Sequence, residues 1–567
     1  MKIVVNLFKN NIGIYKKDCL KAIFFALIEC LFVALIPLFT GKFMDLGIER
    51  HDIEKIIIYS ILVLLSSFLY LLFGVVSVKC AVKGAYGFAN NLRANVFNKI
   101  INFSFKNQNK FTIGELMNRS TKDIYVTTNC FIALIRFALV AIITLIFSII
   151  LIFKIDINVS KVFIYVYPFI ILIMIYLSFK TIPVLFRTMK LSDELNNRLI
   201  ESIEANKLIK SLHKEKYEIE KFSKINSKYF NANIKSKWMF GLSTPICDFA
   251  KFGVTLLIAW IGAKYIVISN NDPELGFTVG NLTSLMTYAG LLHMGISQVL
   301  MMGIMLVSGF IFMKRIENIL EIDNEIEDLG KNDLKLQDGS IEFRNVNFSY
   351  YDNNNFILKN INFKINSGEI VGIFGKTSSG KSSIVNLIPR FYDANLGEII
   401  ISGKNIKEYS LENLHKGIGF VFQKSNLFKG TILDNVKMFD DNIDDKIVEK
   451  SCEIAVADIF INEKKNKYNE EIIEGGMNLS GGQRQRLTIA RAIAKCPKIL
   501  ILDDSFSAVD SKTAIKIKNN LKKELKGTTI IIISDRINSL SDVDKVIYID
   551  DGEIVKIGKY EEIFEKV

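Results

Sequence analysis

Cysteine is sparse and scattered in this chain, which limits the kinds of site that it can form. No CxxC pair occurs among its seven cysteines, which are Cys19, Cys30, Cys80, Cys130, Cys247, Cys452 and Cys496. The sequence therefore predicts neither a disulfide framework nor a zinc site. The basic, mildly amphipathic N-terminus also lacks a cleavable signal pattern. It is typical of a cytosolic helix that lies on the membrane surface before a first span.

The net charge of +12 does not by itself indicate nucleic-acid binding. Many of the lysines, such as Lys207, Lys221 and Lys237, lie between apolar runs. Lysines beside membrane spans usually follow the positive-inside rule and face anionic lipid. We therefore expect membrane lipids, and no nucleic acid, as partners of this basic charge.

Hydrophobic residues make up 50% of the 567 residues and are concentrated in the N-terminal half. Six runs there have the roughly 20 apolar residues that a bilayer crossing requires. They lie near residues 21–43, 56–80, 131–153, 161–183, 246–268 and 284–310. The long lysine-rich links after the second and fourth runs belong in the cytosol, as do both termini. Their helical periodicity predicts that the spans continue as helices outside the membrane.

From Glu342 onward, short β-rich runs alternate with helical ones. This alternation predicts an α/β domain with a largely parallel sheet. The polar stretch before it has the composition of a linker. We expect a membrane domain at residues 1–317, a linker at 318–338 and the α/β domain at 339–567.

The strongest motif is GKTSSGKS, a complete GxxxxGK[ST] between an apolar strand and a helix. Small residues let backbone N–H groups wrap phosphates, and the helix N-terminus favours negative charge. We expect Lys381 to reach the β- and γ-phosphates of ATP, and Ser382 to ligate Mg²⁺. The alternative, a Gly/Ser turn with a chance lysine, leaves the flanking strand and helix unexplained. The predicted ATP-binding residues are Gly375, Lys376, Thr377, Ser378, Ser379, Gly380, Lys381, Ser382 and Ser383.

A second acidic motif, LILDD, places Asp503 at the end of a buried apolar strand. Burying an unpaired carboxylate is costly, and Mg²⁺ is its natural partner. A core aspartate with hydrogen-bond partners is the alternative.

Between these motifs lies LSGGQ, which is followed by a helical run. This pentapeptide resembles the signature motif of ABC transporters. Its residues are Leu479, Ser480, Gly481, Gly482 and Gln483.

Other marks of the ABC family follow in the expected order. Tyr350 resembles the aromatic residue that stacks on adenine. Gln423 resembles the Q-loop glutamine, which contacts Mg²⁺ and faces the membrane domain. Glu474 is similar to the X-loop glutamate of exporters, and Asp510 to the D-loop aspartate.

The membrane half carries weaker resemblances. Residues 111–123 and 201–215 are similar to the two coupling loops of ABC exporters. The resemblance implies a multi-pass α-helical domain, with six spans and long cytosolic extensions, fused to a P-loop ATPase domain. It also implies that two such chains meet head to tail, with each ATP between one chain's P-loop and the other chain's signature serine. A second half-transporter, identical or different, is then required.

Two positions depart from the family pattern. Asp504 stands where the family has the glutamate that orients the attacking water. The missing methylene withdraws the carboxylate by about 1 to 1.5 Å, and such a misplacement can slow catalysis about 100-fold. Asp535 stands where the family has a switch histidine, so an acceptor-only anion replaces a donor near the γ-phosphate.

These departures predict that the site built on Lys381 binds ATP but hydrolyses it slowly or not at all. The signature motif is intact and can complete a partner's site. This asymmetry resembles heterodimeric ABC exporters with one consensus and one degenerate site. A homodimer with two slow sites is the alternative.

Charged residues inside the spans allow two interpretations. They form either a polar cavity for substrate or pairs between helices, such as Glu29 with Arg136, and we favour the pairs. The other charged positions are Asp248, Lys251 and His293.

The cargo stays open among drugs, lipids and short peptides. Because no N-terminal extension could hold a cysteine peptidase, we expect no leader-cleaving peptide export. An importer or an ATP-gated regulator with the exporter architecture is also compatible with the sequence. A soluble ABC ATPase is not, because it would lack the six apolar runs.

Overall fold

The chain forms two compact units, built from residues 1–102 with 111–322 and from residues 103–110 with 323–567. The computed structural model describes residues 2–269, 277–324, 326, 328, 330, 334–350, 355–438, 440 and 442–564. The predicted linker at 318–338 lies partly outside these described residues.

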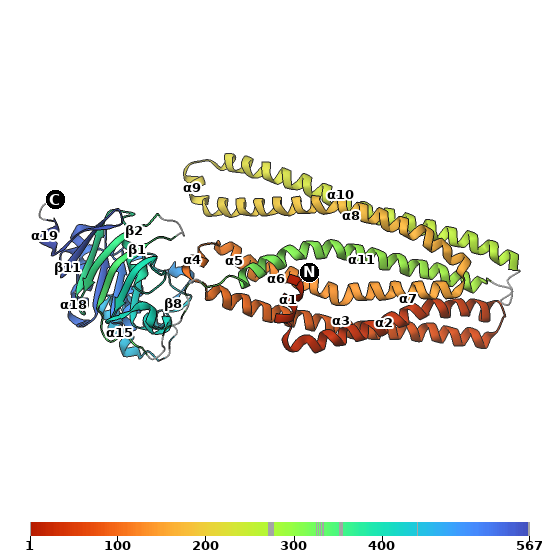
Figure 1. Cartoon of the computed structure of the whole chain (residues 1–567), viewed down its shortest axis with the longest axis horizontal. Coiled ribbons are helices and arrows are strands. Elements are labelled where there is room, and N and C mark those ends of the chain that lie inside the picture. Colours follow the sequence, from red (N-terminus) through yellow and green to blue (C-terminus); the bar gives the residue numbers. More distant parts are fainter. Residues whose placement is uncertain are drawn as a thin grey trace. The chain divides into compact units, whose positions relative to one another are not determined.

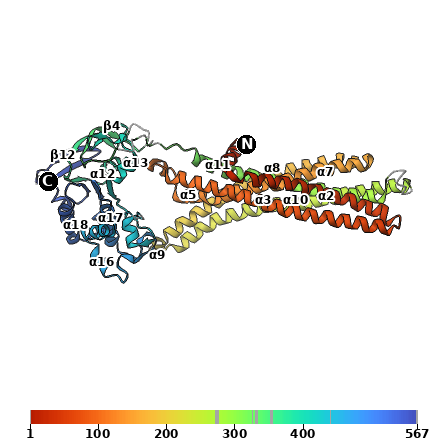
Figure 2. The same ribbon diagram turned by 90° about the horizontal axis from the view of Figure 1, so that it is seen from below.

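The first unit is a bundle of long helices (Figures 1 and 2). Helix α2 pairs with α3, helix α8 pairs with α10, and α11 packs against α7 and α2. The bounds are α2 (Lys16–Lys42), α3 (Ile53–Ile101), α7 (Leu139–Ile155), α8 (Ile157–Glu204), α10 (Glu215–Ser269) and α11 (Val279–Leu320). The shorter helices are α1 (Lys2–Asn11), α5 (Ile113–Ser120), α6 (Lys122–Ile132) and α9 (Asn206–Ser211).

Within the described ranges, six helical stretches are long and apolar enough to cross a membrane, which confirms the predicted number. They are Gly13–Ile48, Ile53–Ile101, Ile113–Ile155, Ile157–Glu204, Pro245–Ile268 and Val279–Leu320. Helices α3 and α8 have 49 and 48 residues. Each is about 70 Å long, against roughly 30 Å of bilayer hydrocarbon. The prediction that spans continue as helices beyond the membrane is therefore confirmed.

Side-chain caps mark where three of the spanning helices begin. Asp52, Asp156 and Thr278 precede α3, α8 and α11, and each accepts a hydrogen bond from a backbone N–H in the first turn. Such caps satisfy donors that the helix cannot satisfy itself. Each of these three helices therefore begins directly after a residue whose side chain caps it.

A buried ion pair joins the first and third spans. Arg136 lies on the π-helical turn η3 (Ala133–Ala138), and its Nη2 is 2.6 Å from Oε2 of Glu29 on α2. Both residues are less than a tenth exposed. The predicted pairing of these two charges is confirmed. His293 on α11 lies 3.9 Å from Asp248 on α10, so that two more of the charged positions face one another.

The second unit has a central six-stranded sheet (Figure 1). Its order is β12 (Glu553–Gly558), β11 (Lys545–Asp550), β3 (Ile370–Gly375), β10 (Thr529–Ile533), β9 (Ile499–Asp503) and β6 (Ile418–Val421). All pairs are parallel except the one between β11 and β12. Strands β9 and β10 are buried along their whole length, as central strands of a parallel sheet require. The predicted α/β class is confirmed.

A smaller antiparallel sheet lies in the same unit. Its order is β2 (Leu358–Ile365), β1 (Ile341–Phe348), β4 (Leu396–Ile401) and β5 (Lys404–Asn405). A two-stranded pair joins β7 (Gly430–Thr431) to β8 (Glu471–Ile472).

The apolar core of this unit lies on both faces of the central sheet. Ile499 and Ile501 of β9 face one cluster, which also contains the smaller sheet and α12 (Lys381–Leu387). Leu500 and Leu502 face the other cluster, which packs against five helices on the second face of the sheet. This alternation is the two-residue period of a strand. The helices on the second face are α14 (Ile432–Lys437), α15 (Asp445–Ile454), α16 (Asp458–Asn462), α17 (Gly481–Ala494) and α18 (Ser511–Glu524).

Candidate nucleotide-binding site

Four neighbouring parallel strands bring predicted site residues to one edge of the central sheet. Strand β3 ends at Gly375 and β9 at Asp503, while Asp535 and Gln423 each come two residues after β10 and β6. The register pairs Ile533 with Asp503. Ligands of open parallel sheets bind outside the carboxyl ends of the strands. The topology therefore collects residues from four distant segments at one place.

The loop after β3 has the backbone of a phosphate-binding turn. Ser378 and Gly380 have φ of +68° and +102°, and such turns point successive N–H groups toward an anion. The φ of Gly380 is one that residues with a side chain rarely adopt, so glycine is favoured there. Among the residues that the structure describes, the buried Ser379 Oγ has no hydrogen-bond partner. A buried, unpaired hydroxyl is costly, and a phosphate oxygen fits as its acceptor.

The Lys381 ammonium group is buried and has three acceptors. Its Nζ donates to the carbonyl oxygens of Gly375 and Lys376, each at 2.7 Å. It also forms an ion pair with Oδ1 of Asp535 at 2.7 Å. The Lys381 side chain is 8% exposed and that of Asp535 is 56% exposed. Because a lysine has three N–H donors, these contacts use them all.

Ser382 and Asp503 lie together where a metal ion was predicted. Ser382 Oγ donates to Oδ1 of Asp503 at 3.4 Å. Burial raises the pKa of Asp503, and the Ser382 hydrogen bond and the Lys381 charge oppose that rise. A hydroxyl and a carboxylate are oxygen ligands of the kind that Mg²⁺ prefers. The residues present therefore fit Mg²⁺ as well as a phosphate chain.

Asp504 has φ of +46°, in the left-handed region. Aspartate adopts this conformation more readily than most side chains do. Its carbonyl oxygen accepts a hydrogen bond from Nε2 of Gln485 at 3.4 Å, and Ala508 N donates to Oε1 of Gln485 at 3.0 Å. Gln485 thus ties helix α17 to the loop that carries Asp504. Sequence reasoning missed Gln485, because its contacts are with a loop about 20 residues further along the chain.

Tyr350 lies beside helix α12, which follows the P-loop. Its hydroxyl is 3.1 Å from Oγ of Ser383, and its ring meets those of Phe348 and Tyr392 edge-on, with centroids 4.8 and 4.9 Å away. The remaining predicted loop residues, Lys376 and Thr377, are exposed at the rim. Lys376 pairs there with Asp550 at 3.4 Å, and Gln423 is exposed beyond β6.

The LSGGQ residues form the start of α17. Ser480 caps the helix through a reciprocal hydrogen-bond pair with Gln483, at 3.2 and 3.0 Å. A Cβ at Gly482 would lie 2.9 Å from the carbonyl oxygen of Ala508, so this residue packs against the loop after β9. Leu479 is buried, whereas Ser480 is exposed and therefore accessible to another molecule. The 14-residue helix adds a partial positive charge at this end.

Two further predicted residues lie at the surface beside these elements. Asp510 caps α18 by accepting a hydrogen bond from Thr513 N at 3.0 Å. This bond lowers the pKa of Asp510. Glu474 is exposed ahead of the signature residues.

A short stretch from the N-terminal half of the sequence packs within the ATPase unit. We name residues Phe103–Lys110 the docking segment; it contains α4 (Phe105–Gln108). The Phe105 ring lies 4.6 Å from that of Phe391, measured between centroids. Asn107 is fully buried, and its Nδ2 donates to the carbonyl oxygen of Asp323 at 2.9 Å. The segment is therefore held by both an aromatic contact and a buried hydrogen bond.

That residues 111–123 form the first coupling loop stays a prediction. Those residues form α5 and the start of α6 in the other unit. Thr112 and Glu115 form a capping box there, which gives the run a strong helical pattern. The docking segment is short and rich in asparagine and lysine, so it has no periodicity to reveal its packing. The second predicted loop contains α9, which belongs to the first unit.

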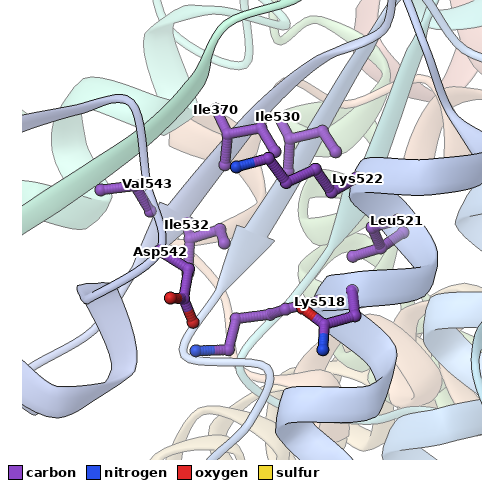
Figure 3. A pocket seen from close by; sticks show the side chains of 9 residues that line it. Ile370, Lys518, Leu521, Lys522, Ile530, Ile532, Asp542 and Val543 are labelled. Atoms are coloured by element: carbon purple, nitrogen blue, oxygen red, sulfur yellow. The ribbon is translucent and has the colours of Figure 1, made fainter.

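A small hollow lies between β10 and α18, away from the P-loop (Figure 3). Lys518 and Asp542 point toward one another, below Ile530 and Ile532 in this view. Its volume of about 20 Å³ is close to that of one water-sized probe. It is therefore too small for a nucleotide.

Comparison with known proteins agrees with this arrangement. A family model described as ABC transporter matches residues 358–507, and one described as ABC transporter transmembrane region matches residues 19–296. The uncharacterised ABC transporter ATP-binding protein YknU of Bacillus subtilis is 33% identical over 485 residues, which cover 84% of this chain and 80% of the relative. The chain belongs to the ABC transporter family.

Two further similarities describe the type of transporter. The ATP-dependent lipid A-core flippase of Syntrophus aciditrophicus is 29% identical over 478 residues, covering 84% of this chain and 78% of the relative. The structure of a bacterial Atm1-family ABC exporter with ATP bound matches with a TM-score of 0.81 and 22% identity, covering 98% of this chain and 97% of that one. This ABC transporter subunit therefore has the exporter fold. It is a multi-pass protein of the cytoplasmic membrane.

Proposed function

We propose that this subunit couples ATP binding and hydrolysis to export across the cytoplasmic membrane, as the degenerate-site half of a heterodimer. The Lys381–Asp535 ion pair is the observation that supports the degenerate-site assignment. A carboxylate, which only accepts hydrogen bonds, lies where the family has a histidine for the γ-phosphate. Asp504 adds to the effect because its side chain is shorter than the family's glutamate.

The proposed site takes ATP with Mg²⁺. Residues 375–383 wrap the phosphates, and Tyr350 contacts the adenine. Ser382, Asp503 and Gln423 hold the metal ion, which stabilises the charge of the phosphates when bound. The unpaired Ser379 hydroxyl and the Ser382–Asp503 contact support this assignment.

A partner chain completes the proposal. The exposed Ser480 at the N-terminus of α17 has the intact family signature, so it suits another chain's P-loop. The partner should carry glutamate and histidine where this chain has Asp504 and Asp535. The working ATPase site then consists of the partner's P-loop and this chain's signature.

A lipid is the first cargo class to test, although a drug-like molecule or a short peptide also fits the architecture. The lipid A-core flippase among the relatives supports this choice. A cavity of about 230 Å³ between α8 and α11 is lined by Lys122, Lys190 and Arg315, together with Asp193. Its excess of cationic side chains suits an anionic headgroup.

ATPase measurements test the heterodimer directly. The purified chain alone should hydrolyse ATP at a rate close to background, and activity should appear when it is co-purified with a second half-transporter that has the consensus residues. In that complex, the double change Asp504→Glu with Asp535→His should raise turnover. The matched control is Asp551→Asn, which alters a fully exposed carboxylate 3.7 Å from Nζ of Lys359.

Rapid hydrolysis by the lone chain, at the rate of an ordinary exporter, would refute the degenerate-site proposal. Slow hydrolysis by the purified chain alone, from two equivalent sites in a dimer of identical chains, would instead support a homodimer. Signature changes separate the two cases. Ser480→Arg should abolish activity of the heterodimer, whereas the same change at the partner's signature should leave most of it.

A further inference from the structure

Asp535 binds an N–H donor of Lys381 that the γ-phosphate of a triphosphate would need. Two of the three Nζ donors are bound by carbonyl oxygens of the P-loop itself, and the third is bound by Asp535. We propose that Asp535 is an internal competitor for the γ-phosphate, so that this site selects nucleoside diphosphates over triphosphates. The proposal deepens the proposed function and rests on its nucleotide site.

Apart from Lys381, which also reaches the β-phosphate, the loop groups expected to hold the inner phosphates make no contact with Asp535 among the described residues. The left-handed turn at Ser378 and Gly380 and the unpaired Ser379 hydroxyl lie in the loop before Lys381. A diphosphate has these groups besides Lys381, so it depends less than a triphosphate does on displacing Asp535. A γ-phosphate must displace Asp535, and the displaced carboxylate then repels it from a short distance.

The backbone around Asp535 is tied to the strand that precedes the P-loop. Ser534 N donates to the carbonyl oxygen of Ile373 at 3.3 Å, and Arg536 N donates to Ser534 Oγ at 3.1 Å. Asp535 therefore leaves Lys381 mainly by rotating its side chain. Since that side chain is 56% exposed, it can turn toward solvent. The selectivity is accordingly graded, and a triphosphate still binds at a cost.

The surrounding charges act in the same direction. Asp503, Asp504 and Asp535 lie close enough to interact electrostatically, with Lys381 as the cation among them. With the family's histidine, one of these three carboxylates would be absent. Each further negative charge on the ligand is therefore less favourable here than in a consensus site.

The test measures affinities for Mg²⁺–ATP and Mg²⁺–ADP on the purified full-length chain, by displacement of a fluorescent ADP analogue. The wild-type chain should bind ADP more tightly than ATP. Asp535→Asn and Asp535→His should each raise the affinity for ATP relative to ADP about tenfold, or about 1.4 kcal/mol. The affinity for ADP should change less than the affinity for ATP, because the inner phosphates have donors in the loop besides Lys381.

Asp550→Asn is the matched control. Its carboxylate lies 3.4 Å from Nζ of Lys376 at the rim of the same loop, so the change in charge is equal but Lys381 keeps its partner. This variant should retain the wild-type ratio of affinities. A shift as large as that of Asp535→Asn would mean that general electrostatics, and not the ion pair, sets the preference.

Two results would overturn the inference. One is tighter binding of ATP than of ADP by the wild-type chain, which needs no variant. The other is an unchanged ratio in both Asp535 variants, each first shown to be folded by size-exclusion chromatography. If the lone chain has low ATPase activity and the Asp535 variants leave the ratio of ATP to ADP affinity unchanged, only this inference is refuted. Rapid ATPase with an ADP-selective ratio refutes only the degenerate-site proposal.

Discussion

An aromatic ring is one of the contacts that hold the docking segment on the ATPase unit, and removing that ring should weaken its packing. Phe105 is 38% exposed, so about 60% of its roughly 200 Å² is buried. At about 25 cal/mol per Å², this burial contributes up to ~3 kcal/mol. Because an opened segment keeps some contacts, we expect Phe105→Ala to weaken the packing by about 2 kcal/mol.

Hydrogen exchange followed by mass spectrometry measures this local opening. A loss of about 2 kcal/mol should speed exchange of the protected amides in residues 103–110 about 30-fold. Exchange in β9 and β10 should be unchanged, because the core of the unit is untouched. We also expect ATP hydrolysis by the complex to continue while transport falls.

The control for this experiment lies a few residues away. Ile113 on α5 is 77% exposed, so Ile113→Ala removes an apolar side chain that buries little surface. Its exchange profile should match the wild type. If Phe105→Ala and Ile113→Ala gave equal exchange in the docking segment, the aromatic anchor would not hold it, and the area argument would be refuted.

Two other predictions concern single buried groups. Burial lowers the pKa of His415, whose Nε2 lies 2.8 Å from the carbonyl oxygen of Pro389. The unfolded chain then takes up the proton first as pH falls below about 6.5, so stability is lost in that window by at most ~1.4 kcal/mol per pH unit. The thermal midpoint should drop between pH 7.5 and 5.5, and His415→Gln should flatten that drop; an equally steep drop in the variant would contradict this. In the membrane unit, Glu29→Gln leaves Arg136 buried without its partner, which should cost about 3–5 kcal/mol. The added change Arg136→Gln should recover part of the lost thermal midpoint, and no recovery would mean that the pair is not the source of the stability.

Much of the fold follows from patterns that lie within short stretches of sequence. The apolar runs predicted six spans because a bilayer requires about 20 apolar residues in succession. The strand that ends at Asp503 and the glycine-rich turn before Lys381 predicted a parallel sheet with a phosphate site at its edge. These features depend on neighbours in sequence, so reading along the chain detects them.

Contacts between distant segments were not predictable in the same way. The docking segment contacts Phe391, which lies far from it in the sequence, and no periodicity in the segment predicts this contact. Gln485 has the same character, because its role depends on where the loop carrying Asp504 passes. The sequence did indicate that Asp535 departs from the family pattern, but not that its carboxylate would bind Lys381.

The structure also separates the two departures that the sequence presented as a pair. Asp504 has a left-handed backbone, and its carbonyl oxygen accepts a hydrogen bond from Gln485. Because the backbone is held in place, the substitution matters through the shorter side chain, which reaches less far than glutamate would. Asp535 takes the partner position on Lys381, so its effect is one of competition for the ligand. Restoring glutamate at 504 alone therefore leaves Lys381 paired with a carboxylate, and turnover should rise little. Restoring histidine at 535 alone should change nucleotide preference without supplying the glutamate. The two changes should therefore act more strongly together than the sum of their single effects, because neighbouring residues of one site are not additive.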